Sequence, residues 1–232
     1  MGSPLHLDPE PIQEGTMGTS VSLARRAIGA ICMLTLLCLG CAQQLSNSSD
    51  PGWITLLDGS NLEQWDIIGK ANWRLVDGVV QADNGNGYLV SRDSYADFQL
   101  RAEFWVDSDA NSGIFLRCID PQKIGNATGY EVNIYDKRAD PDYGTGAIVN
   151  VAKASPMLKA GGQWNVYEIT AKGSELSATL NGIRTAAGQD NKFPSGRIAL
   201  QHGAGIVKFR KVQIRPLETR RGQPIRKDHD EV

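Results

Sequence analysis

The feature that most constrains the fold of this chain is a two-residue alternation of apolar and polar side chains in short segments. It is clearest in residues 98–106 and recurs in residues 130–134 and 176–180. The apolar positions of the first segment are Phe98, Leu100, Ala102, Phe104 and Val106. Successive side chains of a strand point to opposite faces, so this period predicts β-strands with one buried face.

Turn signals separate these segments. Asp77-Gly78 and Asn181-Gly182 are dipeptides that favour the two-residue turn of a β-hairpin, because both positions need positive φ at low steric cost. No segment shows sustained helical periodicity, and no internal repeat is visible. Roughly a dozen short strands between residues 53 and 217 predict one all-β domain, a two-sheet jelly-roll sandwich.

The N-terminal region predicts export. Arg25-Arg26 precedes the uncharged residues 27–39, which are too few to span a bilayer comfortably, and Gly40-Cys41 follows. This order resembles the signal and lipobox of bacterial lipoproteins, with Cys41 as the lipidated residue. An ordinary secretory signal and a single-pass anchor are the alternatives. We therefore expect a leader and signal in residues 1–40, with Met17 as the true start.

The remaining divisions follow from composition. Residues 41–52 are expected to be a lipidated tether, residues 53–217 the β-sandwich, and residues 218–232 a charged tail. The expected location is the cell envelope, on a bacterial membrane that the lipid anchor contacts, facing the periplasm or the exterior. After signal removal and lipidation of Cys41, only Cys118 remains as a free thiol, so no internal disulfide is expected.

Charge and ligand spacing exclude some function classes. The formal net charge is −2, which gives no support to nucleic acid as a partner. Residues 107–111 resemble the start of a calcium loop but lack its later glycine and acid, so they are interpreted as a polar turn. With His202 and His229 alone in the mature chain, a zinc cluster is not expected either. No cofactor is predicted; a divalent metal has no motif to support it.

Glu131 is the first catalytic candidate. Strand alternation places Glu131, Asn133 and Tyr135 on the face opposite Val132 and Ile134. An acid, an amide and an aromatic ring on one face provide hydroxyl partners and a stacking surface, as a sugar site requires. A solvent-facing polar row on an outer sheet is the alternative interpretation.

Arg117 and Glu103 are further candidates on neighbouring segments. Arg117 shares a predicted face with Phe115 and could pair with Glu131 or polarise a substrate carbonyl, although a structural ion pair is equally compatible. Glu103 and Trp105 project away from the core face of their strand and are predicted to contact substrate, the alternative being an ordinary surface glutamate.

The last candidates lie near predicted strand ends. His202, in a loop with Gln201 between strands 197–200 and 206–214, could act as an acid or base near neutral pH. Lys153 follows an apolar run and could reach the same groove, with Thr145 supplying a hydroxyl. A solvated histidine and an ordinary turn are the alternatives.

Six segments taken in order resemble one known family. They are Asn111–Arg117, Gly129–Ile134, Thr145–Ile148, Gln163–Ile169, Gly196–Gly203 and Val207–Ile214. Together they resemble the 3-keto-disaccharide hydrolase domain family, also described as 3-keto-glucoside lyase/hydratase, over residues 53–217. The resemblance implies a concanavalin A-like sandwich, of the lectin and glucanase type, exported to the envelope. Asn133 departs from the family's frequent Gln, and the loop at Gln201-His202 is shorter.

The resemblance implies cleavage of 3-keto-glycosides that a glycoside 3-dehydrogenase has oxidised upstream. A ketone at C3 acidifies the C2 hydrogen, so a base can remove it and the aglycone can leave C1; water addition completes a net hydrolysis. We expect Glu131 as the base, Arg117 or Lys153 at the enolate and His202 as an acid. A direct glucanase-type glycosidase and a non-catalytic carbohydrate-binding module are the rival functions.

Overall fold

A computed structural model describes residues 51–217 and contains thirteen strands in that range. The strands are β1 (Ile54–Leu57), β2 (Trp65–Gly69), β3 (Arg74–Val76), β4 (Val79–Ala82), β5 (Gly87–Tyr95), β6 (Phe98–Val106), β7 (Asn111–Cys118), β8 (Tyr130–Ile134), β9 (Trp164–Lys172), β10 (Glu175–Leu180), β11 (Ile183–Gln189), β12 (Gly196–Ala204) and β13 (Val207–Pro216). One 3₁₀ turn, η1 (Pro141–Tyr143), precedes β9. The predicted signal, Cys41, Met17 and the charged tail lie outside the described residues.

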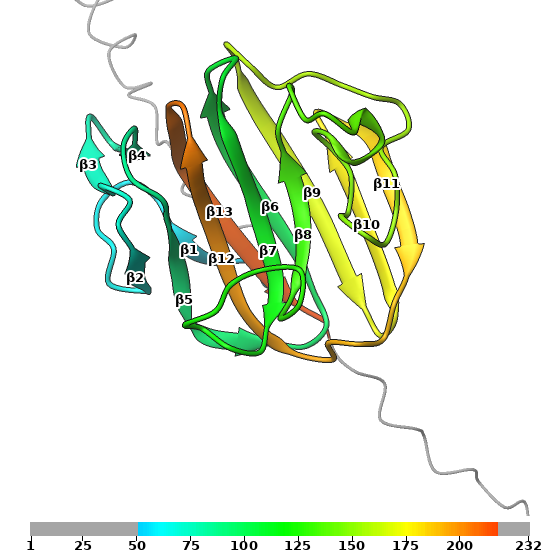
Figure 1. Ribbon diagram of the computed structural model, residues 1–232. Coiled ribbons are helices and arrows are strands. Elements are labelled where there is room, and N and C mark those ends of the chain that lie inside the picture. The colour runs from blue at the N-terminus through cyan, green and yellow to red at the C-terminus, as the bar shows by residue number, and fades with distance from the viewer. Residues whose placement is uncertain (1–50, 218–232) are drawn as a thin grey trace, which may run out of the picture. The chain divides into compact units, whose positions relative to one another are not determined.

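The strands form two antiparallel sheets. The larger has the order β11-β10-β9-β6-β13-β4-β3, with β1 also pairing to β13, and the smaller has the order β2-β5-β12-β7-β8. We call them the eight-stranded and the five-stranded sheet. They face each other as two layers, which can be followed by their labels in Figure 1. The prediction of an all-β, two-sheet sandwich is confirmed.

Alternation explains which side chains form the core. The side chains of β6 alternate between buried and partly exposed along the whole strand, as predicted from its sequence. In β8, Val132 and Ile134 belong to the main core, whereas Glu131 and Asn133 point to the outer face of the five-stranded sheet. Burial of one face of each sheet against the other supplies the main driving force for this arrangement.

Both predicted hairpin turns are present. Asp77 and Gly78 have φ of 50° and 75°, and Asn181 and Gly182 have φ of 51° and 81°. Positive φ at both central residues is the conformation that matches the twist of the flanking strands. These turns connect β3 to β4 and β10 to β11.

One predicted boundary is wrong. Strand β12 continues through Ala204, so Gln201 and His202 lie within a strand and not in a loop. Both have partners in two neighbouring strands, because Gln201 is opposite Tyr88 in β5 and Gly113 in β7. None of the helical segments between residues 51 and 217 is long and apolar enough to cross a membrane.

Candidate functional site

The outer face of the five-stranded sheet carries a row of side chains that crosses four strands. In register, Tyr88 of β5 lies opposite Gln201 of β12, which lies opposite Gly113 of β7, which lies opposite Asn133 of β8. The row beside it carries Val90, Ala199, Phe115 and Glu131. Alternation places both rows on the same face, away from the eight-stranded sheet. We call these two rows the Glu131 face.

Gly113 leaves a gap in the middle of the first row. A Cβ atom at this position would lie 3.0 Å from Oε1 and 3.2 Å from Cγ of Glu131. The Glu131 carboxylate therefore lies directly over the glycine, in space that any other residue would occupy. Ala199 is the small residue of the adjacent row, so the floor of this region is lined by short side chains.

The Glu131 carboxylate is buried. Only 6% of the residue is exposed, and this burial raises the pKa of its carboxyl above the ordinary value. Two smaller effects lower the pKa: Asn126 Nδ2 donates a hydrogen bond of 3.0 Å to Oε2, and Arg138 contributes positive charge. A carboxylate in such surroundings is a stronger base than one in water, as a proton-abstracting group requires.

Two acceptor oxygens on the Glu131 face have no partner. Asn133 donates from Nδ2 to Tyr143 O at 2.7 Å, which fixes its amide, but its buried Oδ1 accepts nothing among the described residues. The buried Oε1 of Gln201 is likewise unpartnered there. Buried polar atoms are normally satisfied, so two such oxygens on one face indicate places where donor groups of a ligand bind.

An apolar group flanks these polar residues. Tyr88 and Phe115 make an edge-to-face contact with ring centroids 5.7 Å apart, and Val90, Ala199 and Cys118 pack with Phe115. Burial raises the pKa of the Tyr88 phenol, and a hydrogen bond with the Gln201 side chain lowers it in part. Tyr88 is therefore a neutral hydroxyl at physiological pH. Alternation along single segments does not predict Tyr88, Gly113 or Asn126 as residues of this site.

Tyr135 and Thr145 lie next to this face but have structural partners. The Thr145 hydroxyl accepts a hydrogen bond from Tyr135 N at 2.9 Å and donates one to Asp136 Oδ1 at 2.6 Å. Residues 146–149 run beside β8, with Asn133 N donating to Ala147 O. Thr145 thus holds the turn after β8 in place.

Arg117 does not lie on the Glu131 face, contrary to its predicted alternation with Phe115. Its φ of +51° interrupts the alternation of side chains within β7. The side chain, 1% exposed, donates to Ala96 O (2.7 Å), Gly173 O (2.8 Å) and Asp97 Oδ1 (3.0 Å). The guanidinium therefore connects turns of both sheets. Arg117 therefore forms a structural ion pair, as the alternative interpretation of the sequence proposed, and its partner is Asp97 and not Glu131.

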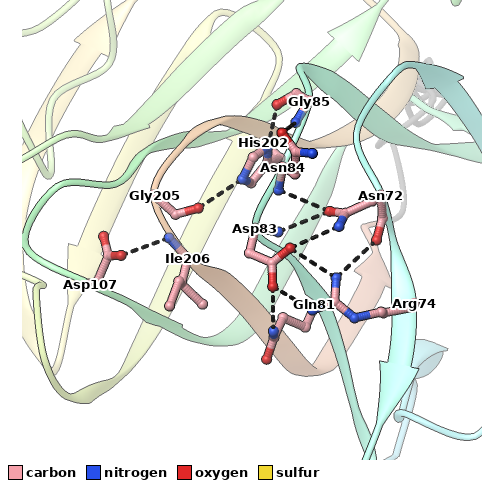
Figure 2. Close-up of polar contacts among 10 residues, drawn as sticks. All are labelled: Asn72, Arg74, Gln81, Asp83, Asn84, Gly85, Asp107, His202, Gly205 and Ile206. Atoms are coloured by element: carbon pink, nitrogen blue, oxygen red, sulfur yellow. Dashed lines mark hydrogen bonds and ion pairs between the residues drawn. The ribbon is translucent and has the colours of Figure 1, made fainter.

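His202 is buried among structural partners. Nδ1 lies 2.8 Å from Gly85 O and Nε2 lies 2.9 Å from Gly205 O (Figure 2). The ring also makes an edge contact with Trp73. Both ring nitrogens are thus occupied by backbone carbonyls. Because β12 side chains alternate, His202 points to the face opposite Gln201, so the structure does not bring it to Glu131.

Figure 2 also shows the polar contacts of Asp83, which follows β4, and of Asp107, which follows β6. Asn72, Arg74 and Gln81 surround the Asp83 carboxylate, with Arg74 Nη1 donating to Oδ1 at 3.1 Å. Asp107 Oδ2 accepts a hydrogen bond of 2.9 Å from Ile206 N. The predicted polar turn at residues 107–111 is held by such backbone bonds. Within residues 51–217 no three His, Cys, Asp or Glu side chains gather as a metal site would require.

Lys153, Glu103 and Trp105 lie apart from Glu131. Lys153 Nζ is 2.6 Å from Asp142 Oδ2, and both side chains are exposed. Glu103 and Trp105 belong to β6 of the eight-stranded sheet and point to its outer face, where Glu103 pairs with Arg210 at 2.5 Å. Because the core separates the two outer faces, neither residue contributes to the Glu131 face.

Cys118 is a buried free thiol at the end of β7. Burial raises its pKa to about 12, so the thiol is protonated at neutral pH and is a poor nucleophile. Its packing with Phe115 indicates a structural role.

Comparison with known proteins adds to this geometry. Residues 52–215 match the model of a 3-keto-alpha-glucoside-1,2-lyase-like domain. No curated protein matches the chain.

Solved structures of other proteins share the fold. Two proposed glycosyl hydrolases from Parabacteroides distasonis ATCC 8503 superpose with TM-scores of 0.61 and 0.62, at 26% and 20% identity; 71% and 72% of this chain is covered, and 99% and 94% of theirs. The carbohydrate-binding module CBM66 from Bacillus subtilis gives a TM-score of 0.50 at 16% identity, over 71% of this chain and 95% of its own. The likenesses at 20% and 16% identity show the sandwich fold alone.

Proposed function

The chain belongs to the 3-keto-alpha-glucoside-1,2-lyase-like domain family, and from this premise we propose that it cleaves glycosides whose sugar carries a ketone at C3. The proposed base is Glu131. The proposed substrate is the product of a glycoside 3-dehydrogenase, because that reaction class supplies the ketone. The family and the fold together indicate a protein that acts on or binds carbohydrate.

One observation carries the proposal. A buried carboxylate with a raised pKa lies over Gly113, on the same sheet face as the unpartnered Asn133 Oδ1 and Gln201 Oε1. Sugar hydroxyls are donors that would satisfy both oxygens, and the carboxylate is the group that would accept a proton from carbon. A solvent-facing polar row would have neither the burial nor the unpartnered atoms.

The proposed first step is an elimination. Glu131 takes the C2 proton, and the C2–H electron pair forms the C1–C2 double bond. The C1–O bond breaks, and the aglycone oxygen takes a proton from the Tyr88 hydroxyl or from water. The ketone at C3 stabilises the negative charge that develops at C2. Water then adds to C1 and a proton returns to C2, so the sum is hydrolysis of the glycoside. No redox partner is needed.

Tyr88 is the residue that we assign to the developing enolate or to the leaving oxygen. Burial raises the pKa of its phenol, so the hydroxyl is neutral at physiological pH, and Tyr88 lies opposite Gln201 in the same row as Gly113. Arg117 and Lys153 are weaker candidates because carbonyls and Asp97 occupy Arg117, and Asp142 holds Lys153. We do not assign this role to His202, because its two ring nitrogens lie against backbone carbonyls.

Substrate entry requires that the Asn126 amide move. Asn126 lies in the connection between β7 and β8 and donates to the Glu131 carboxylate at 3.0 Å, in the place of a substrate group. We propose that a sugar hydroxyl or the C2–H group replaces this amide when the glycoside binds.

A direct glycosidase has less support. Retaining hydrolysis needs two carboxylates about 5–5.5 Å apart, and Asp136 is the next acidic residue after Glu131 in the sequence. Asp136 accepts hydrogen bonds from the Thr145 hydroxyl, Ala160 N and Gly161 N at 2.6 to 3.0 Å. A carboxylate held by these donors is a structural group and is a weak nucleophile.

The test is turnover of p-nitrophenyl 3-keto-α-glucopyranoside by the wild-type protein and by Glu131→Gln. We expect Glu131→Gln to lower kcat/KM by roughly 10²–10⁴-fold, because the amide cannot accept the C2 proton. Glu103→Gln is the matched control, since this glutamate lies on the other sheet, and it should keep wild-type activity.

The same assay with the unoxidised parent glucoside separates the rival functions. Equal cleavage of both glucosides would contradict the ketone mechanism and favour a direct glycosidase. Binding of sugars without cleavage of either would favour a carbohydrate-binding module. Full activity of Glu131→Gln would exclude this residue as the base.

A further inference from the structure

The outer face of the eight-stranded sheet carries a second polar groove that the proposed function does not use. One part has a volume of about 260 Å³ and the adjoining part about 390 Å³, and both are lined by Thr170, Ser177 and Arg184. It crosses β9, β10 and β11. This face points away from the core in the direction opposite to the Glu131 face.

Register explains the shape of the groove. One row across the sheet contains Arg101, Glu168, Thr179 and Arg184, and the next contains Gln99, Thr170, Ser177 and Ala187. The two middle strands contribute the hydroxyl side chains Thr170, Ser177 and Thr179 together with Glu168, and an arginine stands at each end of the first row. With strands spaced about 4.8 Å apart, roughly 15 Å separate β6 from β11, the length of two to three sugar rings.

The groove has an excess of positive charge. In the first part of the groove, Arg101 forms an ion pair with Glu168 at 3.2 Å, and this pair neutralises the charge of one arginine. Arg215 donates from Nε to the neutral Gln99 Oε1 at 3.1 Å. Arg184 is exposed, and its side chain has no hydrogen bond or ion pair with any residue in the 51–217 range. These two guanidinium groups are therefore left without a paired carboxylate. Glu175 lines the adjoining part of the groove, so three arginines face two glutamates and the net charge stays positive.

The ring of Trp53 lines one end of the groove. The guanidinium carbons of Arg101 and Arg215 lie 4.9 and 5.0 Å from the centre of its ring. These cation–π contacts hold both arginines against the sheet, so that less side-chain entropy is lost when they bind a ligand.

From this arrangement we propose that the groove binds an acidic glycan, with Arg184 and Arg215 recognising carboxylates of uronate units and the hydroxyl floor contacting ring hydroxyls. A guanidinium binds a carboxylate through two parallel hydrogen bonds. Thr170, Ser177 and Thr179 can donate to and accept from sugar hydroxyls. The site is non-catalytic and retains a polymer on the face opposite Glu131.

The test compares polygalacturonate with its fully methyl-esterified form, which has the same backbone without the charge. We expect affinity electrophoresis to show retardation by polygalacturonate alone. Arg184→Gln should weaken binding at least tenfold. Lys208→Gln removes a positive charge from the same sheet outside the groove and should leave binding unchanged. Circular dichroism confirms that both variants are folded.

Four results would overturn the proposal. They are absence of retardation, equal retardation by the esterified polymer, equal weakening by Arg184→Gln and Lys208→Gln, and binding of phosphatidylglycerol vesicles that competes fully with polygalacturonate. The last result would assign the face to an anionic lipid surface instead. Glu131→Gln should still bind polygalacturonate, and Arg184→Gln should still cleave the 3-keto-glucoside. The failure of this proposal can therefore be distinguished from the failure of the proposed function.

Discussion

The hydrogen bond from Asn126 lowers the pKa of the Glu131 carboxyl and so limits how basic this carboxylate is. Burial raises the pKa of this carboxyl, and the hydrogen bond from Asn126 opposes the rise by stabilising the charged form. A base must be deprotonated, so activity should fall on acidification. The acid limb should lie above the ordinary pKa of a glutamate.

Asn126→Ala should move this limb to higher pH. Without the amide donor the charged carboxylate loses a stabilising hydrogen bond, so its pKa rises further. The measurement is kcat/KM against pH for wild type and variant with the 3-keto-glucoside. A limb that stays in place or moves to lower pH would show that Asn126 does not act on the base.

At single residues, the alternation pattern predicts the sheet face of some side chains correctly and of others incorrectly. Alternation in β8 predicts that Glu131 and Asn133 share the outer face, and they do. It fails at Arg117, because a positive φ at that residue breaks the period and nothing local in the sequence signals it. The pattern also predicts a loop at His202, between strands 197–200 and 206–214, yet pairing with β5 and β7 extends the first strand.

At the scale of elements, the candidate site depends on the register of four strands. Tyr88, Gln201, Gly113 and Asn133 align although they are far apart in the chain. Local turns such as Asn181-Gly182 fix only the pairing of neighbouring strands. The pairing of β12 with β5 and β7 arises from packing of the whole sheet, so a sequence pattern cannot identify Tyr88 or Gly113 as parts of one site.

Gly113→Ala tests whether the gap in this row is functional. The new Cβ would lie 3.0 Å from Glu131 Oε1 and would displace the carboxylate by a few tenths of an ångström. A misplacement of about 1 Å can cost about 10²-fold in rate, so for this smaller shift we expect kcat/KM to fall by roughly 10-fold with little change in Tm.

Gly188→Ala is the matched control for this change. Gly188 is also a strand glycine, and its Cβ would approach Val151 Cγ1 to 3.0 Å, but it lies in β11 of the other sheet. It should keep wild-type turnover. Equal losses in both variants would mean that the effect of Gly113→Ala is a general packing defect.

At the scale of the whole molecule, the sandwich separates two polar surfaces. The Glu131 face belongs to the five-stranded sheet, and the arginine-lined groove belongs to the eight-stranded one. The shared core between them explains why Glu103 and Trp105, predicted as substrate contacts, cannot join Glu131. Alternation gives the face of a strand but not the sheet to which the strand belongs.

Export and lipidation are proposals that the sequence alone supports. If Cys41 carries the lipid, Cys41→Ser should move the protein from the membrane fraction to the soluble fraction of a bacterial expression host. Incorporation of radiolabelled palmitate measures the modification directly. Labelling of the Ser variant, or no labelling of the wild type, would contradict the assignment.

The most direct measurement is the deuterium isotope effect on cleavage of a 3-keto-α-glucoside labelled at C2. If Glu131 removes the C2 proton during elimination, the labelled substrate reacts more slowly, with a primary effect on kcat/KM that the C1-labelled substrate does not show. Cleavage at the same rate for the C2-labelled and unlabelled substrates, together with an effect at C1 alone, would contradict proton abstraction by Glu131.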